Sequence, residues 1–136
     1  MEQVLKNFTL EFFGKGKHKI LPEDFLKIKD GFLLDVRLRE EASAVSIKMK
    51  HLSNVKCKNI PVNELPDRIK EIPTSKSVAI FCPANVRSSI TYAYLCSKGY
   101  SNVRIMEGGY VALMNAIKPG KILKNIAETN FSGTAK

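Results

Sequence analysis

Runs of apolar residues alternate with segments of helical periodicity along most of the chain. The runs at 32–36 and 78–81 are short and almost wholly apolar, as in strands that are covered on both faces of a parallel sheet. After the second run, apolar residues recur at Ile90, Ala93 and Tyr94, which is the spacing of a helix. This alternation predicts one α/β domain with a mainly parallel sheet of about five strands and helices on both faces.

The remaining elements are predicted from shorter patterns. We expect three further short strands: one that ends at Ile20, one at 59–60 and one at 103–106. We expect helices at 2–13, from Pro22 onward, within 61–72 and at 110–117. The helix at 2–13 is expected to pack on the sheet, with a subunit interface as the alternative. Residues 42–58 have the least regular pattern and are expected to be loop-rich and basic. The tail at 121–136 is rich in small and polar residues and is expected to be mobile.

A cysteine directly follows the apolar run at 78–81. Cys82 therefore lies between the carboxyl end of a predicted strand and the start of a predicted helix. Unpaired N–H groups and the positive end of the helix dipole favour an anion at such a position, so a thiolate is stabilised there. Arg87, five residues later, adds positive charge. This pattern predicts that Cys82 is a nucleophile.

Composition sets wider limits. A chain of 136 residues with 44% hydrophobic content supports one domain with a single core. The formal net charge of +9 attracts small anions and would also support weak contact with nucleic acid or an acidic partner, without choosing among them. Three cysteines without a C-x-x-C pair, and only two histidines, give no zinc-ligand spacing. Free thiols and the absence of a signal-peptide pattern make the cytoplasm the expected compartment.

Four segments, with the order and spacing that they have in this chain, resemble the rhodanese family of sulfurtransferases. They are the segment 33–37 with Glu40 and Glu41, the segment 59–66, the six-residue loop from Cys82 to Arg87 followed by Ser88, and the closing segment 102–109. The resemblance extends from about Lys19 to about Ala116. It implies a three-layer rhodanese-like domain at 19–120, preceded by a helical extension and basic link at 1–18 and followed by the tail at 121–136.

The resemblance also implies the site and its chemistry. Cys82 is the nucleophile and takes the outer sulfur of a donor such as thiosulfate as a persulfide, which cyanide or a thiol then removes. No cofactor or metal is implied, and a sulfur-acceptor protein is a possible partner, whereas nucleic acid and membrane contacts are not expected. Site residues implied besides Cys82 are the loop residues Pro83, Ala84, Asn85, Val86 and Arg87, with Arg87 and Arg37 binding substrate and Asp35 and Ser88 organising the loop.

Two loop positions depart from the family pattern. Asn85 stands where glycine is frequent, and asparagine tolerates the left-handed backbone better than most residues, so the turn is expected to persist. Pro83 has no N–H, so at most four of the five later loop residues can donate backbone hydrogen bonds towards the sulfur. Activity lower than the family norm is therefore an expectation.

Other function classes remain open at this point. Phosphatases and arsenate reductases of the same fold also place Cys before Arg, but their loop has five intervening residues where this chain has four. A non-catalytic binding or sulfur-carrying module is the second alternative. Of the other thiols, Cys57 lies between two lysines and is expected to be a surface thiol without function, and Cys96 is expected to be buried. His51 is a candidate for a histidine that the family carries near this point, displaced by an insertion.

Overall fold

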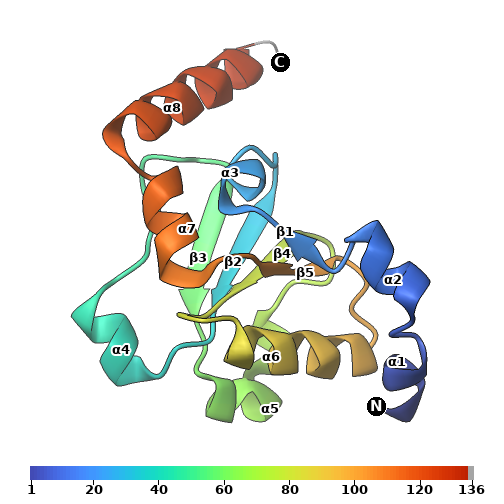
Figure 1. The fold of residues 1–136 in the computed structure, drawn as a ribbon. Helices are drawn as coiled ribbons and strands as arrows, with labels where there is room; N and C mark the ends of the chain where they lie inside the picture. Colours follow the sequence, from blue (N-terminus) through green and yellow to red (C-terminus); the bar gives the residue numbers. More distant parts are fainter. Residues whose placement is uncertain (135–136) are drawn as a thin grey trace.

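The computed structural model describes the backbone of residues 1–134, and the side chains of these residues apart from position 125 and positions 128–134. Its centre is a five-stranded sheet with the spatial order β1-β5-β4-β2-β3, and every strand pairing is parallel (Figure 1). The predicted parallel sheet of about five strands is therefore confirmed. The strands are β1 Lys19–Ile20, β2 Gly31–Asp35, β3 Val55–Asn59, β4 Ser77–Phe81 and β5 Val103–Met106.

Helices occupy most of the connections between the strands. Short 3-10 turns η1 Val62–Glu64 and η2 Ile69–Glu71 flank the helix α5, which is Leu65–Arg68. The α-helices are α1 Glu2–Lys6, α2 Leu10–Lys15, α3 Pro22–Phe25, α4 Arg39–Ala44, α5 Leu65–Arg68, α6 Val86–Ser97, α7 Gly109–Ala116 and α8 Pro119–Thr134.

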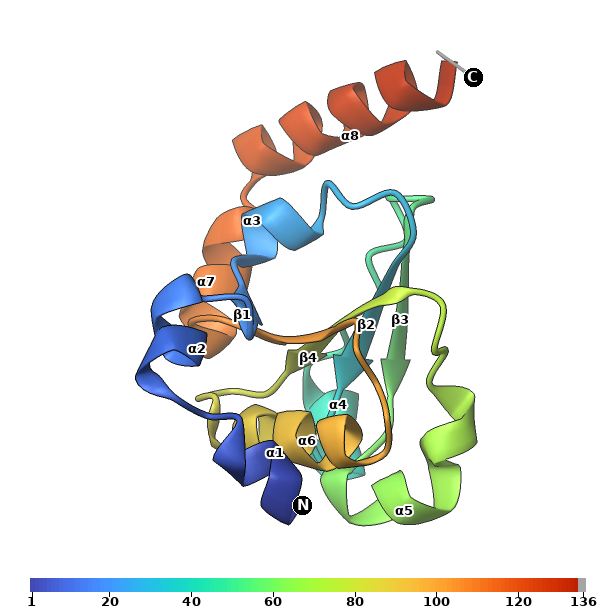
Figure 2. The same ribbon diagram turned by 90° about the vertical axis from the view of Figure 1, so that its right-hand side faces the viewer.

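Side chains of the central strands alternate between two cores, one on each face of the sheet. Leu33 and Phe81 pack with residues of α3 and α7, whereas Leu34 and Ile80 pack with residues of α5 and α6. Figure 2 shows these two pairs of helices on opposite sides of the sheet. All five residues of β2 are buried, which explains why the strand reads as a nearly continuous apolar run.

The register of the central strands determines where the site is built. Asp35, the last residue of β2, pairs in register with Phe81, the last residue of β4. Because the strands are parallel, Cys82 emerges at the same edge of the sheet as the Asp35 carboxylate. This carboxyl edge is where open α/β sheets place their ligand sites.

The N-terminal prediction of one helix at 2–13 is wrong. The segment forms α1 and α2, because Thr9 Oγ1 accepts a hydrogen bond from Phe12 N at 3.2 Å and so starts a new helix. The segment packs on α6 and against the core cluster on that face of the sheet. The Phe8 ring stacks on Tyr92 of α6, with their centroids 6.2 Å apart.

The third strand is longer than predicted. β3 begins at Val55, four residues before the expected strand at 59–60, and it ends at Asn59. Exposed Lys56 and Lys58 alternate with the more buried Val55, Cys57 and Asn59, as expected for a strand with one face towards the core. The lysines at every second position made the strand resemble a basic loop in the sequence.

The C-terminal segment continues as a helix. Ile117 caps α7, and Pro119 is the first residue of α8, a position where proline is well tolerated. Residues 121–134 of the expected tail thus belong to α8, and residues 135–136 lie outside the described range. None of the helices within residues 1–134 has the length and apolar character that crossing a membrane requires.

Candidate active site

The candidate nucleophile lies at the junction of β4 and α6. Cys82 follows the last residue of β4 directly and is 1% exposed. Its Sγ accepts a hydrogen bond from Ser88 N at 3.2 Å, and Ser88 Oγ lies 3.3 Å from the same sulfur. A thiol donates to that hydroxyl, whereas a thiolate accepts from it. Ser88, in the first turn of α6, therefore contacts the sulfur directly, where the sequence analysis gave it only a loop-organising role.

Asn85 makes the turn from the loop into the helix. It has φ 67° and caps α6, so this asparagine adopts the left-handed conformation for which glycine is the usual residue. The side-chain amide of Asn85 is oriented so that both of its polar atoms have partners. Its Nδ2 donates to Met106 O at 3.1 Å, and its Oδ1 accepts from Gly108 N at 3.2 Å. The loop is thereby fastened to the end of β5.

A second attachment joins the loop to the start of α7. Tyr110 N donates a hydrogen bond to Pro83 O at 3.2 Å. Gly109 has φ 55°, and a Cβ at this position would lie only 1.8 Å from Pro83 O. Only glycine allows α7 to approach the loop this closely. Pro83 thus lacks an N–H, but its carbonyl group holds the loop in place.

The arginine that ends the loop is paired with a carboxylate on α4. Arg87 donates from Nη1 to Glu41 Oε2 at 2.5 Å and from Nη2 to Glu41 Oε1 at 2.9 Å. Glu41 Oε2 also accepts from Leu38 N at 2.9 Å. The hydrogen bonds from Arg87, which have the larger effect, and from Leu38 N lower the pKa of Glu41 to about 2. The carboxylate is therefore ionised at neutral pH. The sequence analysis did not identify Glu41 as the partner of Arg87.

Arg37 is not placed to bind substrate, the role that the resemblance implied for it, because its side chain is buried. It is fully buried, and it donates from Nε to Asp35 Oδ1 at 2.9 Å and from Nη2 to Asp35 Oδ2 at 2.7 Å. Its Nη1 donates to the hydroxyl of Tyr110 at 2.9 Å, and its guanidinium lies over the rings of Phe81 and Tyr110. Asp35 therefore acts on Arg37 rather than on Arg87, and this buried pair ties β2 to α7.

Asn59 is a further residue that the sequence analysis did not single out. Its Nδ2 donates to the backbone carbonyl groups of Asp35 and Arg37, at 2.9 and 2.8 Å. The side chain thereby fixes the backbone on either side of Val36, at the edge where the site forms. Its place at the end of an alternating strand was the available signal, but nothing local identified its partners 22 and 24 positions earlier.

The other thiols lie outside this arrangement. Cys57 is half-buried on β3, and burial raises its pKa to about 12, so the expected surface position is wrong. Cys96 is half-buried on α6, and burial also raises its pKa. His51 is exposed in the segment between α4 and β3.

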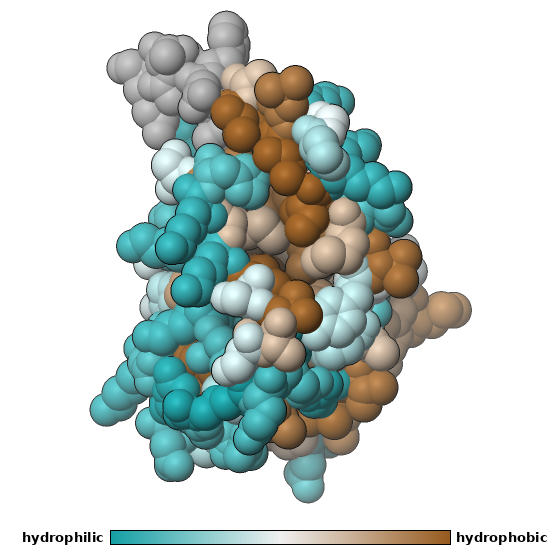
Figure 3. All heavy atoms as spheres, turned by 90° about the vertical axis from the view of Figure 1, so that its left-hand side faces the viewer, coloured by the Kyte–Doolittle hydropathy of each residue, from teal (hydrophilic) through white to brown (hydrophobic). Residues whose placement is uncertain are grey.

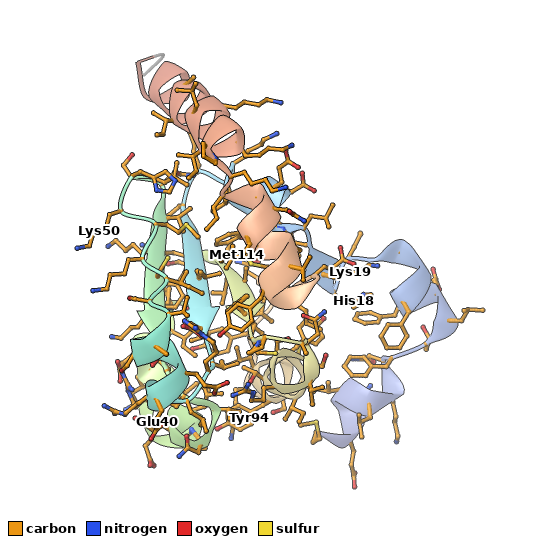
Figure 4. All side chains as sticks on the ribbon, turned by 60° about the vertical axis from the view of Figure 1, so that its left-hand side comes forward. His18, Lys19, Glu40, Lys50, Tyr94 and Met114 are labelled. Atoms are coloured by element: carbon orange, nitrogen blue, oxygen red, sulfur yellow. The ribbon has the colours of Figure 1, made fainter. Side chains whose placement is uncertain are left out.

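Figure 4 looks along α6, with α4 on one side of it and α7 above it, and the site lies where these three helices and the sheet edge meet.

The sequence model of the family described as Rhodanese-like domain matches residues 21–116. A protein named sulfurtransferase from Allochromatium vinosum is 38% identical over 53 residues, which are 39% of this chain and 50% of that protein. The chain thus spans about half the length of this curated relative.

Solved structures of two small proteins are similar over nearly their whole length. A rhodanese-related protein from Thermoplasma volcanium is 28% identical with a TM-score of 0.58, covering 75% of this chain and 95% of that one. A human single-domain sulfurtransferase is 25% identical with a TM-score of 0.53, covering 74% of this chain and 98% of that one. The residues matched by the family model include strands β2 to β5 and the loop that carries Cys82.

Proposed function

This chain belongs to the rhodanese-like family, and on that premise we propose that it transfers sulfane sulfur from a donor such as thiosulfate to an acceptor through a persulfide on Cys82. The observation that supports this most is the environment of the sulfur. Cys82 Sγ lies at the start of α6 with the amide and the hydroxyl of Ser88 directed at it. Both groups stabilise negative charge on sulfur, as nucleophilic attack requires.

The first half of the cycle loads the cysteine. The Cys82 thiolate attacks the outer sulfur of the donor and forms a new S–S bond, while the donor's own S–S or S–S(O) bond breaks and its electron pair leaves with the remainder of the donor. Thiosulfate thereby gives the Cys82 persulfide anion and sulfite, and a persulfide R–S–SH gives the Cys82 persulfide and the thiolate of R. No external oxidant or reductant is needed.

The second half of the cycle unloads the cysteine. Cyanide or an acceptor thiolate attacks the terminal sulfur of the persulfide, and the bond between the two sulfurs breaks with its electron pair returning to Cys82. The products are thiocyanate or a new persulfide, together with the original thiolate. The acceptor is a small thiol or a sulfur-acceptor protein in this proposal. Covalent transfer in two steps predicts ping-pong kinetics.

The loop length separates this proposal from phosphate chemistry. The loop has four residues between Cys82 and Arg87, one fewer than the phosphatases considered above. Its arginine is also held by Glu41 rather than directed freely at an oxyanion. Both features favour one sulfur atom over a tetrahedral oxyanion as the group held beside Cys82.

Intact mass is the direct test of the persulfide. Wild-type protein treated with thiosulfate or with an alkyl persulfide should gain the mass of one sulfur atom and lose it to cyanide, and Cys82→Ser should do neither. Cys96→Ala is the matched control, since it removes a second α6 thiol and should load as wild type does. Cyanide-labile sulfur on Cys82→Ser, or phosphate release from an aryl phosphate by wild type but not by Cys82→Ser, would overturn the proposal.

A further inference from the structure

Both arginines near the nucleophile are already paired with carboxylates. Arg37 is bound bidentately by Asp35, and Arg87 is bound bidentately by Glu41. The two positive charges are thus matched by two negative charges within the same site. The positive net charge of the whole chain brings small anions to its surface, but the arginine beside the sulfur is not free to receive them.

Glu41 is the carboxylate that a donor would meet. It is partly exposed, with a side-chain accessibility of 34%, whereas Asp35 is buried. Its hydrogen bonds to Arg87 and to Leu38 N keep it ionised at neutral pH. Glu41 occupies both Nη atoms of Arg87, so a doubly charged donor that binds these atoms displaces Glu41, and a donor that binds elsewhere on Arg87 still approaches a carboxylate of like charge.

The segments around the site also expose apolar side chains. Leu38 lies just before α4 and is 40% exposed, Val86 is the first residue of α6 and is 67% exposed, and Val111 lies on α7 and is 74% exposed. Figure 3 shows apolar residues gathered over α7 and the first turns of α8 on this side of the molecule. Such side chains suit an uncharged organic group better than a hydrated sulfur oxyanion.

We propose that Glu41 determines the donor specificity of this site, by occupying Arg87 and so disfavouring small dianions such as thiosulfate relative to alkyl persulfides. The inference rests on the proposed sulfur transfer through Cys82 and names the class of donor for it. The favoured donor is R–S–SH with an uncharged R. The Cys82 thiolate attacks its terminal sulfur, the S–S bond of the donor breaks, and R–S⁻ leaves, so no group in the reaction needs a free arginine.

The test compares two donors on three proteins. Second-order rate constants for loading of Cys82 are measured by intact mass with thiosulfate and with the persulfide of N-acetylcysteine amide. Wild type should load at least roughly tenfold faster from the alkyl persulfide, and Glu41→Gln should raise the thiosulfate rate constant by roughly tenfold, the order expected from removing one nearby like charge. The alkyl persulfide rate constant should change less than roughly threefold, since that donor does not compete for Arg87.

Glu40 supplies the matched control. It is the neighbouring glutamate on α4, is exposed, and points outward from the site (Figure 4). Glu40→Gln changes the net charge by the same amount, so it should leave both rate constants as in wild type. An equal rise in thiosulfate loading with Glu40→Gln would mean that overall charge, not the Arg87 pair, sets the preference, and the proposal would fail.

A second measurement covers the case in which Glu41→Gln loses stability. Alkylation of Cys82 by iodoacetate and by iodoacetamide compares a charged and a neutral reagent of similar size on the intact wild-type protein. Wild type should favour iodoacetamide by at least roughly tenfold, and 0.5 M salt should reduce that preference. The specificity role of Glu41 would be overturned if iodoacetate and iodoacetamide alkylated wild type at equal rates, or if thiosulfate loaded Cys82 faster than the alkyl persulfide. If neither donor loaded Cys82, the proposed sulfur transfer itself would fail.

Discussion

Replacing Gly109 with alanine tests whether the close contact between α7 and the loop holds the nucleophile in place. Gly109 is the first residue of α7 and has φ 55°. A Cβ at this position would lie 1.8 Å from Pro83 O and 2.7 Å from Pro83 C. The backbone on one side of this contact must therefore move.

The size of the movement follows from the contact distance. Carbon and oxygen atoms approach each other to about 3.3 Å in proteins, so the Gly109→Ala Cβ and Pro83 O, now 1.8 Å apart, must separate by about 1.5 Å. Pro83 is bonded directly to Cys82, so the shift acts on the residue that carries the nucleophile. A misplacement of about 1 Å can cost about a hundredfold in rate, and we expect a loss of loading rate of this order. The left-handed backbone adds about 1 kcal/mol of destabilisation.

Gly99→Ala separates the two effects. Gly99 also has a positive φ, 91°, but apart from Gly99 itself and its two chain neighbours no atom of the described residues lies within 4 Å of the position of its Cβ. This variant should lose about 1 kcal/mol in urea unfolding and keep its loading rate. The reasoning is refuted if Gly109→Ala, folded by circular dichroism, loads Cys82 as fast as Gly99→Ala does.

Three further predictions concern the hydrogen bonds of the site. Ser88→Ala keeps the amide but removes the hydroxyl 3.3 Å from the sulfur. This variant should slow loading of Cys82 by about tenfold or more, since a hydrogen bond to a charged group contributes about 1.5–3 kcal/mol. Ser97→Ala, farther along the same helix, should have no effect in the same mass assay. Asp35→Asn leaves the buried charge of Arg37 without its counterion and should lower the free energy of unfolding in urea by about 3–5 kcal/mol, and a loss below about 1 kcal/mol would contradict the role of this pair. The pKa of Glu41 is lowered from 4.5 to about 2, so its pair stabilises the fold fully above about pH 4.5 and less as pH falls towards 2. The urea midpoint of wild type should therefore exceed that of Glu41→Gln by a constant amount well above pH 4.5, and a difference that keeps its full size at pH 2 would exclude this ion pair as its source.

The sheet and the position of the nucleophile were predictable because both depend on local pattern. A buried parallel strand has to be apolar along its whole length, so β2 and β4 were evident as apolar runs. The polar residues at their carboxyl ends, Asp35 and Cys82, were then expected at one edge of the sheet. Asn85 could be assigned to a turn because few other residues adopt a left-handed backbone at low cost.

The pairings of charged groups were not predictable in the same way. Glu41 and Arg87 are 46 positions apart, and the exposed Glu40 beside Glu41 has the same side chain. Arg37 was expected to bind substrate, although it is buried against a partner only two residues away. Such pairings depend on how the elements pack, and no local pattern of side chains specifies them.

The two edges of the sheet have a consequence for how copies of the protein behave at high concentration. β1 has only two residues, and β3 carries exposed Lys56 and Lys58 along the opposite edge. An unpaired edge strand can recruit another chain into a continuous sheet, and short edges and lysine side chains are two ways in which natural proteins prevent this. Lys58 is paired with Glu71 at 2.7 Å, so when two β3 edges approach each other it is chiefly the Lys56 side chains that bring like charges together before backbone hydrogen bonds can form. Part of the large positive charge of this chain therefore protects it against edge-to-edge aggregation.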